Sequence, residues 1–477
     1  MKWKSTLVLL FLVIAAGAYV SLYELKQPLP EEREALSRQV ARINAETATL
    51  LAINMGQREV VLQKTDGHWR ARVFADPATA VHWVRADSQL VGRILNELEP
   101  LEAERALMPS KGRPLALADY GLQPPRGSLI AGDASQTMTL LFGESTAIGG
   151  NRYVKRADTA AVYVIADTLF TEADQPLETF RSRDLFDTDF RSANRIAITS
   201  TPTRYTLEKS QGRWNLIEPI ADATNPNTVS LRLGKLQELR AQRFITDAPT
   251  PDELASWGLE PPAARITLTV TGQPTPTDVL IGHATADNPD QRYAKRSDEP
   301  VVCAVPGKSV DELLQDPQAL RSHACFDFFT EQVIKAQVTG SQVSWTIEKV
   351  GNVWKDASGR AMEPAKLEAW LNNARDLKLN RFVEDAPQDV ARYGLNPPQG
   401  TIAVWASGQD EPQTLMIGAP VENGLTRYGQ IKGRNSVVEL PELIGSIWTA
   451  SPDAWRASPA GSSSASESTQ APGASAE

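Results

Sequence analysis

One block of about 140 residues occurs three times in this chain of 477 residues. A helical pattern of apolar residues recurs twice at an offset of 138: Val91, Leu95, Leu98 and Leu101, then Val229, Leu233, Leu236 and Leu239, then Leu367, Leu371, Ala374 and Leu377. Spacings of three and four residues place these side chains on one helical face, which can pack on the core of its own copy. The repeat therefore predicts a tandem array of three similar domains.

A second motif ends a short helix in each copy. An aromatic residue, a glycine and a leucine precede two prolines within residues 119–125, 256–262 and 392–398. Glycine accepts the left-handed conformation that ends a helix, and proline prevents its continuation. The predicted structural motif of the repeat comprises Tyr120, Gly121, Leu122, Pro125, Trp257, Gly258, Leu259, Pro262, Tyr393, Gly394, Leu395 and Pro398.

Strand patterns complete each copy. Segments ending in Trp69, Trp214 and Trp354 read as strands, and β-branched runs such as residues 162–165 close the copies. No crossover helix separates the later strands, which favours antiparallel pairing. We predict an α+β fold of three tandem α+β repeats with mainly antiparallel sheets, preceded by one N-terminal transmembrane helix.

The first residues indicate export. Lys2 and Lys4 precede an uncharged run over residues 5–23, long enough to cross a bilayer as a helix with the lysines on the cytoplasmic side. A cleaved signal peptide is the alternative, because residues 16–18 have the small-x-small form of a cleavage site. The first reading predicts a single pass in the inner (cytoplasmic) membrane, with the bulk of the chain periplasmic or extracytoplasmic.

The markers also set the expected boundaries. The Ser-, Ala- and Gly-rich C-terminus cannot bury a core and should be disordered. We expect a signal anchor at 1–24, a spacer and short helix around Val40 and Ile43 at 25–50, repeats at 51–190, 191–330 and 331–453, and a disordered tail at 454–477.

The two cysteines of the chain, Cys303 and Cys325, both lie in the second copy. They replace Tyr163 and Leu185 of the first copy, so two apolar positions change together. An oxidising exported location favours a disulfide closing a loop of 21 intervening residues. Two independent buried thiols are the alternative.

An Arg-Tyr pair recurs in every copy, and an exposed arginine beside an aromatic residue is typical of a binding surface. A residue needed in three copies is more simply explained by the fold, with tyrosine packing and arginine pairing at the sheet edge. The possible binding patch comprises Arg152, Tyr153, Arg292, Tyr293, Arg427 and Tyr428.

The sequence offers no pattern typical of catalysis. Its four histidines lack metal-ligand spacing, and Gly307-Lys308-Ser309 lacks the earlier glycine of a phosphate-binding loop. We therefore expect no enzyme activity, no metal and no cofactor. The net charge of −9, without any basic run, argues against nucleic acid as a partner.

These markers together resemble the tandem repeats of the family called domain of unknown function 4340, from about Ile53 to Trp448. The resemblance implies an accessory protein encoded beside gliding-motility-type ABC transporter components, with an ABC-type permease and its extracytoplasmic partner protein as partners. The expected function is a non-enzymatic, membrane-anchored extracytoplasmic accessory or scaffold subunit of an ABC-type envelope transport complex. The alternative is a periplasmic binding module for a glycan, lipid or peptide held in grooves between repeats.

Overall fold

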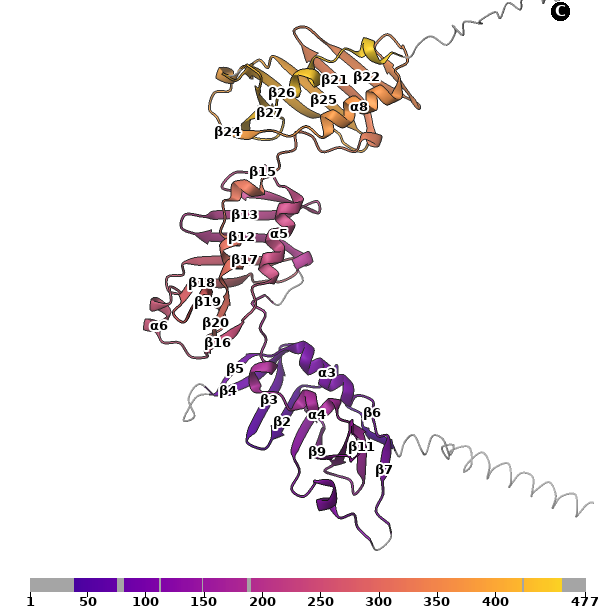
Figure 1. Cartoon of the computed structure of the whole chain (residues 1–477), viewed down its shortest axis with the longest axis vertical. Helices are drawn as coiled ribbons and strands as arrows, with labels where there is room; N and C mark the ends of the chain where they lie inside the picture. The colour runs from indigo at the N-terminus through magenta and orange to yellow at the C-terminus, as the bar shows by residue number, and fades with distance from the viewer. Residues whose placement is uncertain are drawn as a thin grey trace, which may run out of the picture. The chain divides into compact units, whose positions relative to one another are not determined.

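A computed structural model describes residues 38–74, 81–110, 113–147, 149–186, 190–422 and 424–456 of the chain. These residues form mostly antiparallel β-structure in four sheets (Figure 1). The predicted α+β class is therefore wrong. Each copy forms one helix of more than ten residues against eight or nine strands, and the expected capped helix shrinks to a 3₁₀ turn in the first and third copies.

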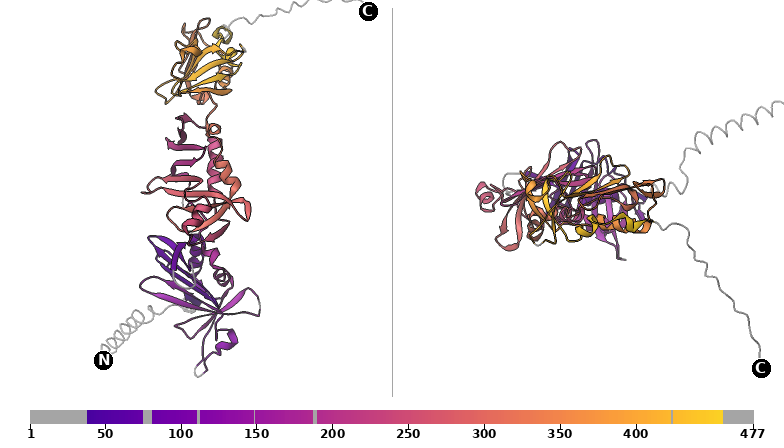
Figure 2. Two further views of the ribbon diagram at one scale, coloured as in Figure 1. Left: turned by 90° about the vertical axis from the view of Figure 1, so that its left-hand side faces the viewer. Right: turned by 90° about the horizontal axis from the view of Figure 1, so that it is seen from above.

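Each copy builds one large sheet whose neighbouring strands lie side by side (Figures 1 and 2). The first sheet has the order β5 (Val81–Arg85), β4 (His68–Phe74), β3 (Arg58–Thr65), β2 (Leu50–Met55), β8 (Gly127–Gly132), β9 (Thr137–Ser145), β10 (Asn151–Arg156), β11 (Val162–Ala166) and β7 (Arg105–Leu107). The short strands β1 (Gln39–Ala41) and β6 (Leu101–Glu102) pair separately. Val40 thus lies in a strand, so the helix expected there is wrong.

The other two sheets repeat this order. The second consists of β15 (Asp222–Ala223), β14 (Arg213–Glu218), β13 (Arg204–Ser210), β12 (Ala193–Ser200), β17 (Ala264–Val270), β18 (Thr277–Thr285), β19 (Asn288–Arg296), β20 (Val302–Pro306) and β16 (Arg243–Thr246). The third consists of β23 (Val353–Asp356), β22 (Trp345–Val350), β21 (Val333–Gly340), β25 (Gly400–Ala406), β26 (Gln413–Pro420), β27 (Arg427–Ile431), β28 (Ser436–Leu440) and β24 (Arg381–Asp385). The last strand of each large sheet comes after the long helix in the chain, directly in the second and third copies and after β6 in the first.

The long helices form over most of the predicted apolar spacing: α3 (Ser88–Leu98), α5 (Pro226–Gln237) and α8 (Pro364–Arg375). The last predicted position of each pattern lies beyond the helix end: Leu101, Leu239 and Leu377. Asp87 and Asn225 cap the first two by accepting hydrogen bonds from backbone N–H groups, whereas Glu363 makes no side-chain cap. Shorter helical segments are α4 (Thr168–Ala173), α6 (Pro251–Ser256), α7 (Gly307–Leu313), α9 (Ile444–Trp448), η2 (Leu117–Tyr120), η3 (Leu177–Phe180), η4 (Phe190–Ser192), η5 (Pro317–Leu320), η6 (Thr330–Gln332), η7 (Ala391–Tyr393) and η8 (Pro452–Trp455).

The chain folds as two compact units. One contains Met1–Asp187, Leu239–Pro262 and Val279–Gly307, and the other contains Thr188–Glu238, Ala263–Asp278 and Lys308–Glu477. The second sheet contributes strands to both units.

Two predicted terminal segments fall wholly or partly outside the described residues. The expected signal anchor at 1–24 lies outside them, and no helix within them has the length and apolar content needed to span a bilayer. The expected disordered tail begins too early, because Trp455 is buried in the third core at 8% exposure. Residues 457–477 lie outside the described part of the chain.

Candidate functional site

The glycine of the aromatic-Gly-Leu motif takes the left-handed conformation in every copy. Its φ is 63° at Gly121, 66° at Gly258 and 66° at Gly394. A Cβ atom on Gly258 would lie 2.6 Å from the ring of His283. Backbone conformation and available space therefore both require glycine. The peptide bond before the first proline of the motif is cis in all three copies, which the sequence analysis did not foresee.

The structure brings the two predicted motifs together. In each copy the motif's aromatic ring packs on the tyrosine of the Arg-Tyr pair, with ring centroids 5.0 Å apart for Tyr120 and Tyr153, 5.0 Å for Trp257 and Tyr293, and 4.9 Å for Tyr393 and Tyr428. Aromatic pairs at this separation stabilise a fold beyond the area that they bury. The tyrosines of the possible binding patch and the aromatic residues of the helix-ending motif therefore pack in one cluster in each copy.

The arginines of the Arg-Tyr pairs lie against the sheet. Arg152 donates to the backbone oxygen of Gly143 at 2.7 Å and to Asp167 at 2.5 Å. Arg427 donates to the backbone oxygen of Gly418 at 3.0 Å. Arg292, in the second copy, is half-buried on β19. Arg152 and Arg427 therefore hold the corresponding glycines of β9 and β26.

Both cysteines are buried free thiols, so the predicted disulfide is wrong. Cys303 lies on β20 with its Sγ atom 3.5 Å from the backbone oxygen of Ala294. Cys325 belongs to the core of the third copy, where its N–H donates to Leu377. The boundary expected between residues 330 and 331 therefore lies too far along the chain, because residues from Cys325 onward already pack in the third core. Burial raises the pKa of each thiol to about 12.

Two connectors, residues 181–185 and 321–325, link successive copies and were not predicted. Each hydrogen-bonds to the backbone of both copies that it joins. In the first, Ser182 N donates to Arg85 O at 2.9 Å and Ala241 N donates to Arg183 O at 2.7 Å. The second makes the same bonds between Ser322 N and Ala223 O at 2.8 Å, and between Leu379 N and His323 O at 2.9 Å.

Each connector begins with an arginine that reaches the next copy. The guanidinium carbon of Arg181 lies 3.7 Å from the ring centroid of Phe244, and its Nη1 lies 3.3 Å from Oδ2 of Asp247. Arg321 repeats this arrangement in the second unit. Its guanidinium lies 3.4 Å from the centroid of Phe382, and its Nη2 lies 3.0 Å from Oδ1 of Asp385. Cation–π contact and ion pairing thus act on the same buried side chain.

Each junction contains a further ion pair, and the copy that supplies the positive charge differs between the two junctions. In the first unit, Nε of Arg85 lies 2.6 Å from Oε1 of Glu299. In the second unit, Asp222 accepts from Nε of Arg321 and from Nε of Arg434, both at 2.6 Å. Glu299 and Arg434 occupy corresponding positions just before β20 and β28, whereas Asp222 lies one residue before Ala223, the counterpart of Arg85, so the copy that supplies the cation differs between the two junctions.

The sequence carried a signal for these junctions. Arg-Ser occurs at residues 181–182 and 321–322, and Arg-Phe-x-x-Asp occurs at 243–247 and 381–385. The first copy has Ala106 and Pro109 at the phenylalanine and aspartate positions. A comparison of what only two copies share would have pointed to the residues that join them.

An open groove follows the last strand of the sheet at each junction. The first has a volume of about 290 Å³ and is lined by Glu178, Arg181, Arg183 and residues 242–247. The second has a volume of about 450 Å³ and is lined by Gln318, Ala319, His323 and residues 380–385. These are corresponding positions, so the groove is one feature formed twice.

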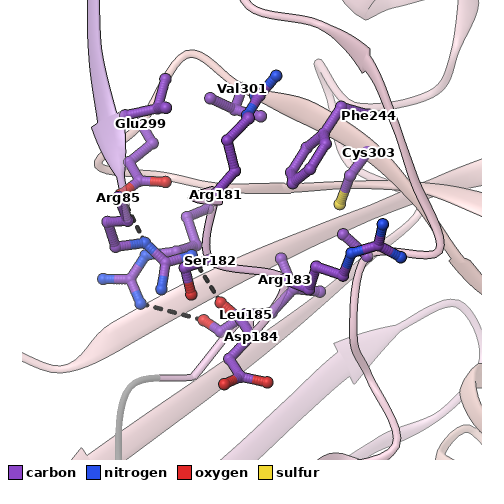
Figure 3. A pocket seen from close by; sticks show the side chains of 13 residues that line it. Arg85, Arg181, Ser182, Arg183, Asp184, Leu185, Phe244, Glu299, Val301 and Cys303 are labelled. Atoms are coloured by element: carbon purple, nitrogen blue, oxygen red, sulfur yellow. Dashed lines mark hydrogen bonds and ion pairs between the residues drawn. The ribbon is translucent and has the colours of Figure 1, made fainter. Parts of the chain in front are cut away.

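A smaller cavity of about 20 Å³ lies under the first connector. Figure 3 shows Arg85, Arg181 and Cys303 among the side chains around it. This volume has room for about one water molecule and none for a larger ligand. Within the described ranges, no group of three or more His, Cys, Asp or Glu side chains could hold a metal ion.

The architecture defines a repeat protein of three antiparallel sheets, with two junctions closed by a buried arginine. The chain belongs to the family described as domain of unknown function (DUF4340), whose family model matches residues 78–253, 214–373 and 358–459. The three matched segments reproduce the threefold repeat. No curated protein matches the chain.

Proposed function

We propose that this protein is a non-enzymatic accessory or scaffold subunit of an ABC-type envelope transport complex, attached to the membrane and extracytoplasmic. The observation that carries the proposal is the use of charged residues at the junctions. The contacts that join one copy to the next use three charged side chains that are 7%, 1% and 1% exposed: Arg181, Arg321 and Asp222. Charged groups that are buried and paired in this way support connection between domains.

Two further observations support the cellular setting. The uncharged run at residues 5–23 behind two lysines favours membrane attachment. The resemblance of the repeat motifs to proteins encoded beside gliding-motility-type ABC transporter components supplies the partner, an ABC-type permease with its extracytoplasmic partner protein.

Affinity purification from membranes in mild detergent tests this function. We expect the tagged full chain to carry a permease and an extracytoplasmic protein with it. A matched chain, in which a cleavable signal peptide replaces residues 1–24, should still capture the extracytoplasmic partner because the repeats would make that contact. Absence of every transporter component from both preparations would contradict the proposal.

The second candidate function is a periplasmic binding module, favoured by the grooves at the two junctions. The repeated tryptophans do not favour a sugar ligand, because Trp69 and Trp354 are only 7% and 5% exposed. Stacking on a sugar ring requires an accessible aromatic face.

A further inference from the structure

We propose that the grooves along β16 and β24 each bind an extended segment of another polypeptide, which joins the sheet edge as an added strand. This inference goes beyond the scaffold function and does not depend on the identity of any transporter. It begins from the position of the two strands, since β16 and β24 are the last strands of their sheets. Backbone groups on the outer side of such a strand can pair with another chain.

The connectors occupy part of this outer edge. Gln242 N donates inward to Ala304 O of β20, whereas the preceding residue, Ala241, donates outward to Arg183 O of the connector. The third sheet repeats the alternation, because Asn380 N donates to Glu439 O of β28 and Leu379 N donates to His323 O. The chain itself therefore already adds an extended segment to this edge in both units.

The groove begins where each connector leaves the edge. Successive N–H groups of a strand point to opposite sides, so the N–H groups of Arg243 and Arg381 are directed outward, like those of Ala241 and Leu379. The residues from Gln242 to Asp247 and from Asn380 to Asp385 line the grooves over the length of the strands. An added strand would continue the line of the connector.

The side chains around the grooves favour a polypeptide over a glycan, lipid or small anion. Arg243 pairs with Asp287 at 2.5 Å, Arg381 pairs with Glu439 at 2.8 Å, and Glu384 pairs with Arg392. A sugar or an anion would have to compete with these partners. Strand addition requires only backbone hydrogen bonds, and alternate side chains then give specificity.

The first copy provides an internal contrast. Residues 38–41 pair with the first copy as the connectors pair with the later copies, because Ala103 N donates to Arg38 O at 2.7 Å, but the repeated Phe and Asp are Ala106 and Pro109 there. The inference therefore assigns two sites, separated by 138 residues in sequence. A partner with two extended segments would gain avidity from occupying both.

The test uses a fluorescent peptide of alternating valine and threonine with a lysine at each end, titrated into the purified chain. A matched peptide carries N-methyl groups on alternate residues, which removes the hydrogen bonds along one edge. Glu178→Trp and Gln318→Trp fill the two grooves from exposed positions on η3 and η5. Ala454→Trp is the control, because it places the same side chain at an exposed position on η8, which lines neither groove.

We expect two peptides to bind per chain, one in either groove variant and none in the double variant, with the Ala454→Trp protein unchanged. The N-methylated peptide should bind at least about tenfold more weakly. Circular dichroism of each variant establishes that its fold is retained. Three results would each overturn the proposal: no saturable binding at millimolar peptide, equal binding of the N-methylated peptide, or undiminished binding by the folded double variant.

Discussion

The Asp222→Asn substitution tests the physical account of the second junction. Asp222 is 1% exposed at its side chain and accepts hydrogen bonds from two arginines, Arg321 and Arg434. Asparagine keeps the shape of the side chain and can still accept from Ala223 N, which donates to Oδ1 of Asp222 at 2.9 Å. The substitution removes the negative charge and replaces Oδ2, which accepts from Arg321 Nε and Arg434 Nη2, by an NH2 group that cannot accept from them.

The expected cost follows from what remains around each arginine. In the variant, Arg321 still pairs with Asp385 at 3.0 Å. Arg434 pairs with no other carboxylate among the described residues and still donates to the backbone oxygens of Ser322 and Ala324. Breaking a buried ion pair from one side costs about 3–5 kcal/mol. Because one of the two cations keeps a carboxylate, we expect the lower end, about 3 kcal/mol.

Urea denaturation followed by tryptophan fluorescence measures this cost. Trp345, Trp370 and Trp455 pack together in the third core and report on the unit that contains the junction. A loss of about 3 kcal/mol should lower the transition midpoint by about 1 M or more. Adding Arg434→Gln should restore part of the loss, since it removes the cation that was left unpaired.

The control is an exposed pair in the same unit. Arg213 and Asp327 pair at 71% and 70% side-chain exposure. Asp327→Asn should change stability by less than about 1 kcal/mol. Equal losses for Asp222→Asn and Asp327→Asn would refute the claim that burial makes the junction charges important.

Three other outcomes follow from the same contacts. Gly258→Val should destabilise the chain by at least about 1–2 kcal/mol in urea denaturation, because its φ of 66° suits glycine; no measurable loss would contradict the cap. Burial raises the pKa of Cys303 and Cys325 from 9.0 to about 12, so their contribution to stability is complete below pH 9 and is lost as pH rises towards 12; thermal melts should show this fall and Cys→Ala variants should lessen it. Glu299→Arg should lower the melting temperature by placing a like charge against Arg85, and adding Arg85→Glu should restore it. A double variant whose melting temperature stays low would exclude direct pairing of the two residues.

The sequence predicted features determined by local spacing. The three long helices and their face towards the core follow from apolar residues three and four apart, which require no knowledge of distant contacts. The left-handed glycines lie where the motif predicts a helix end. The balance of strand and helix was wrong because a single 3₁₀ turn, such as η2 or η7, ends with the same residues as a longer helix.

Aligning all three copies by their shared markers did not reveal the contacts between copies, because the Arg-Phe-x-x-Asp segment at the junctions occurs only in the second and third copies. Alignment treated Cys325 as a second-copy residue because its counterpart, Leu185, falls at the end of the first copy. The structure places Cys325 in the third core, since a segment that leaves one domain can pack on the next. Charge pairs such as Arg85 with Glu299 join residues 214 positions apart, which no local pattern reveals.

The ion pairs beside the two connectors restrict which copy can follow which, because the copy that supplies the positive charge differs between the two junctions. Arg85 of the first copy meets Glu299 of the second, whereas Asp222 of the second meets Arg434 of the third. A shortened gene that joined the first copy directly to the third would bring Arg85 towards Arg434, and two arginines would share a space without water to separate them. Exact loss of the middle copy would therefore produce a protein destabilised at its new junction.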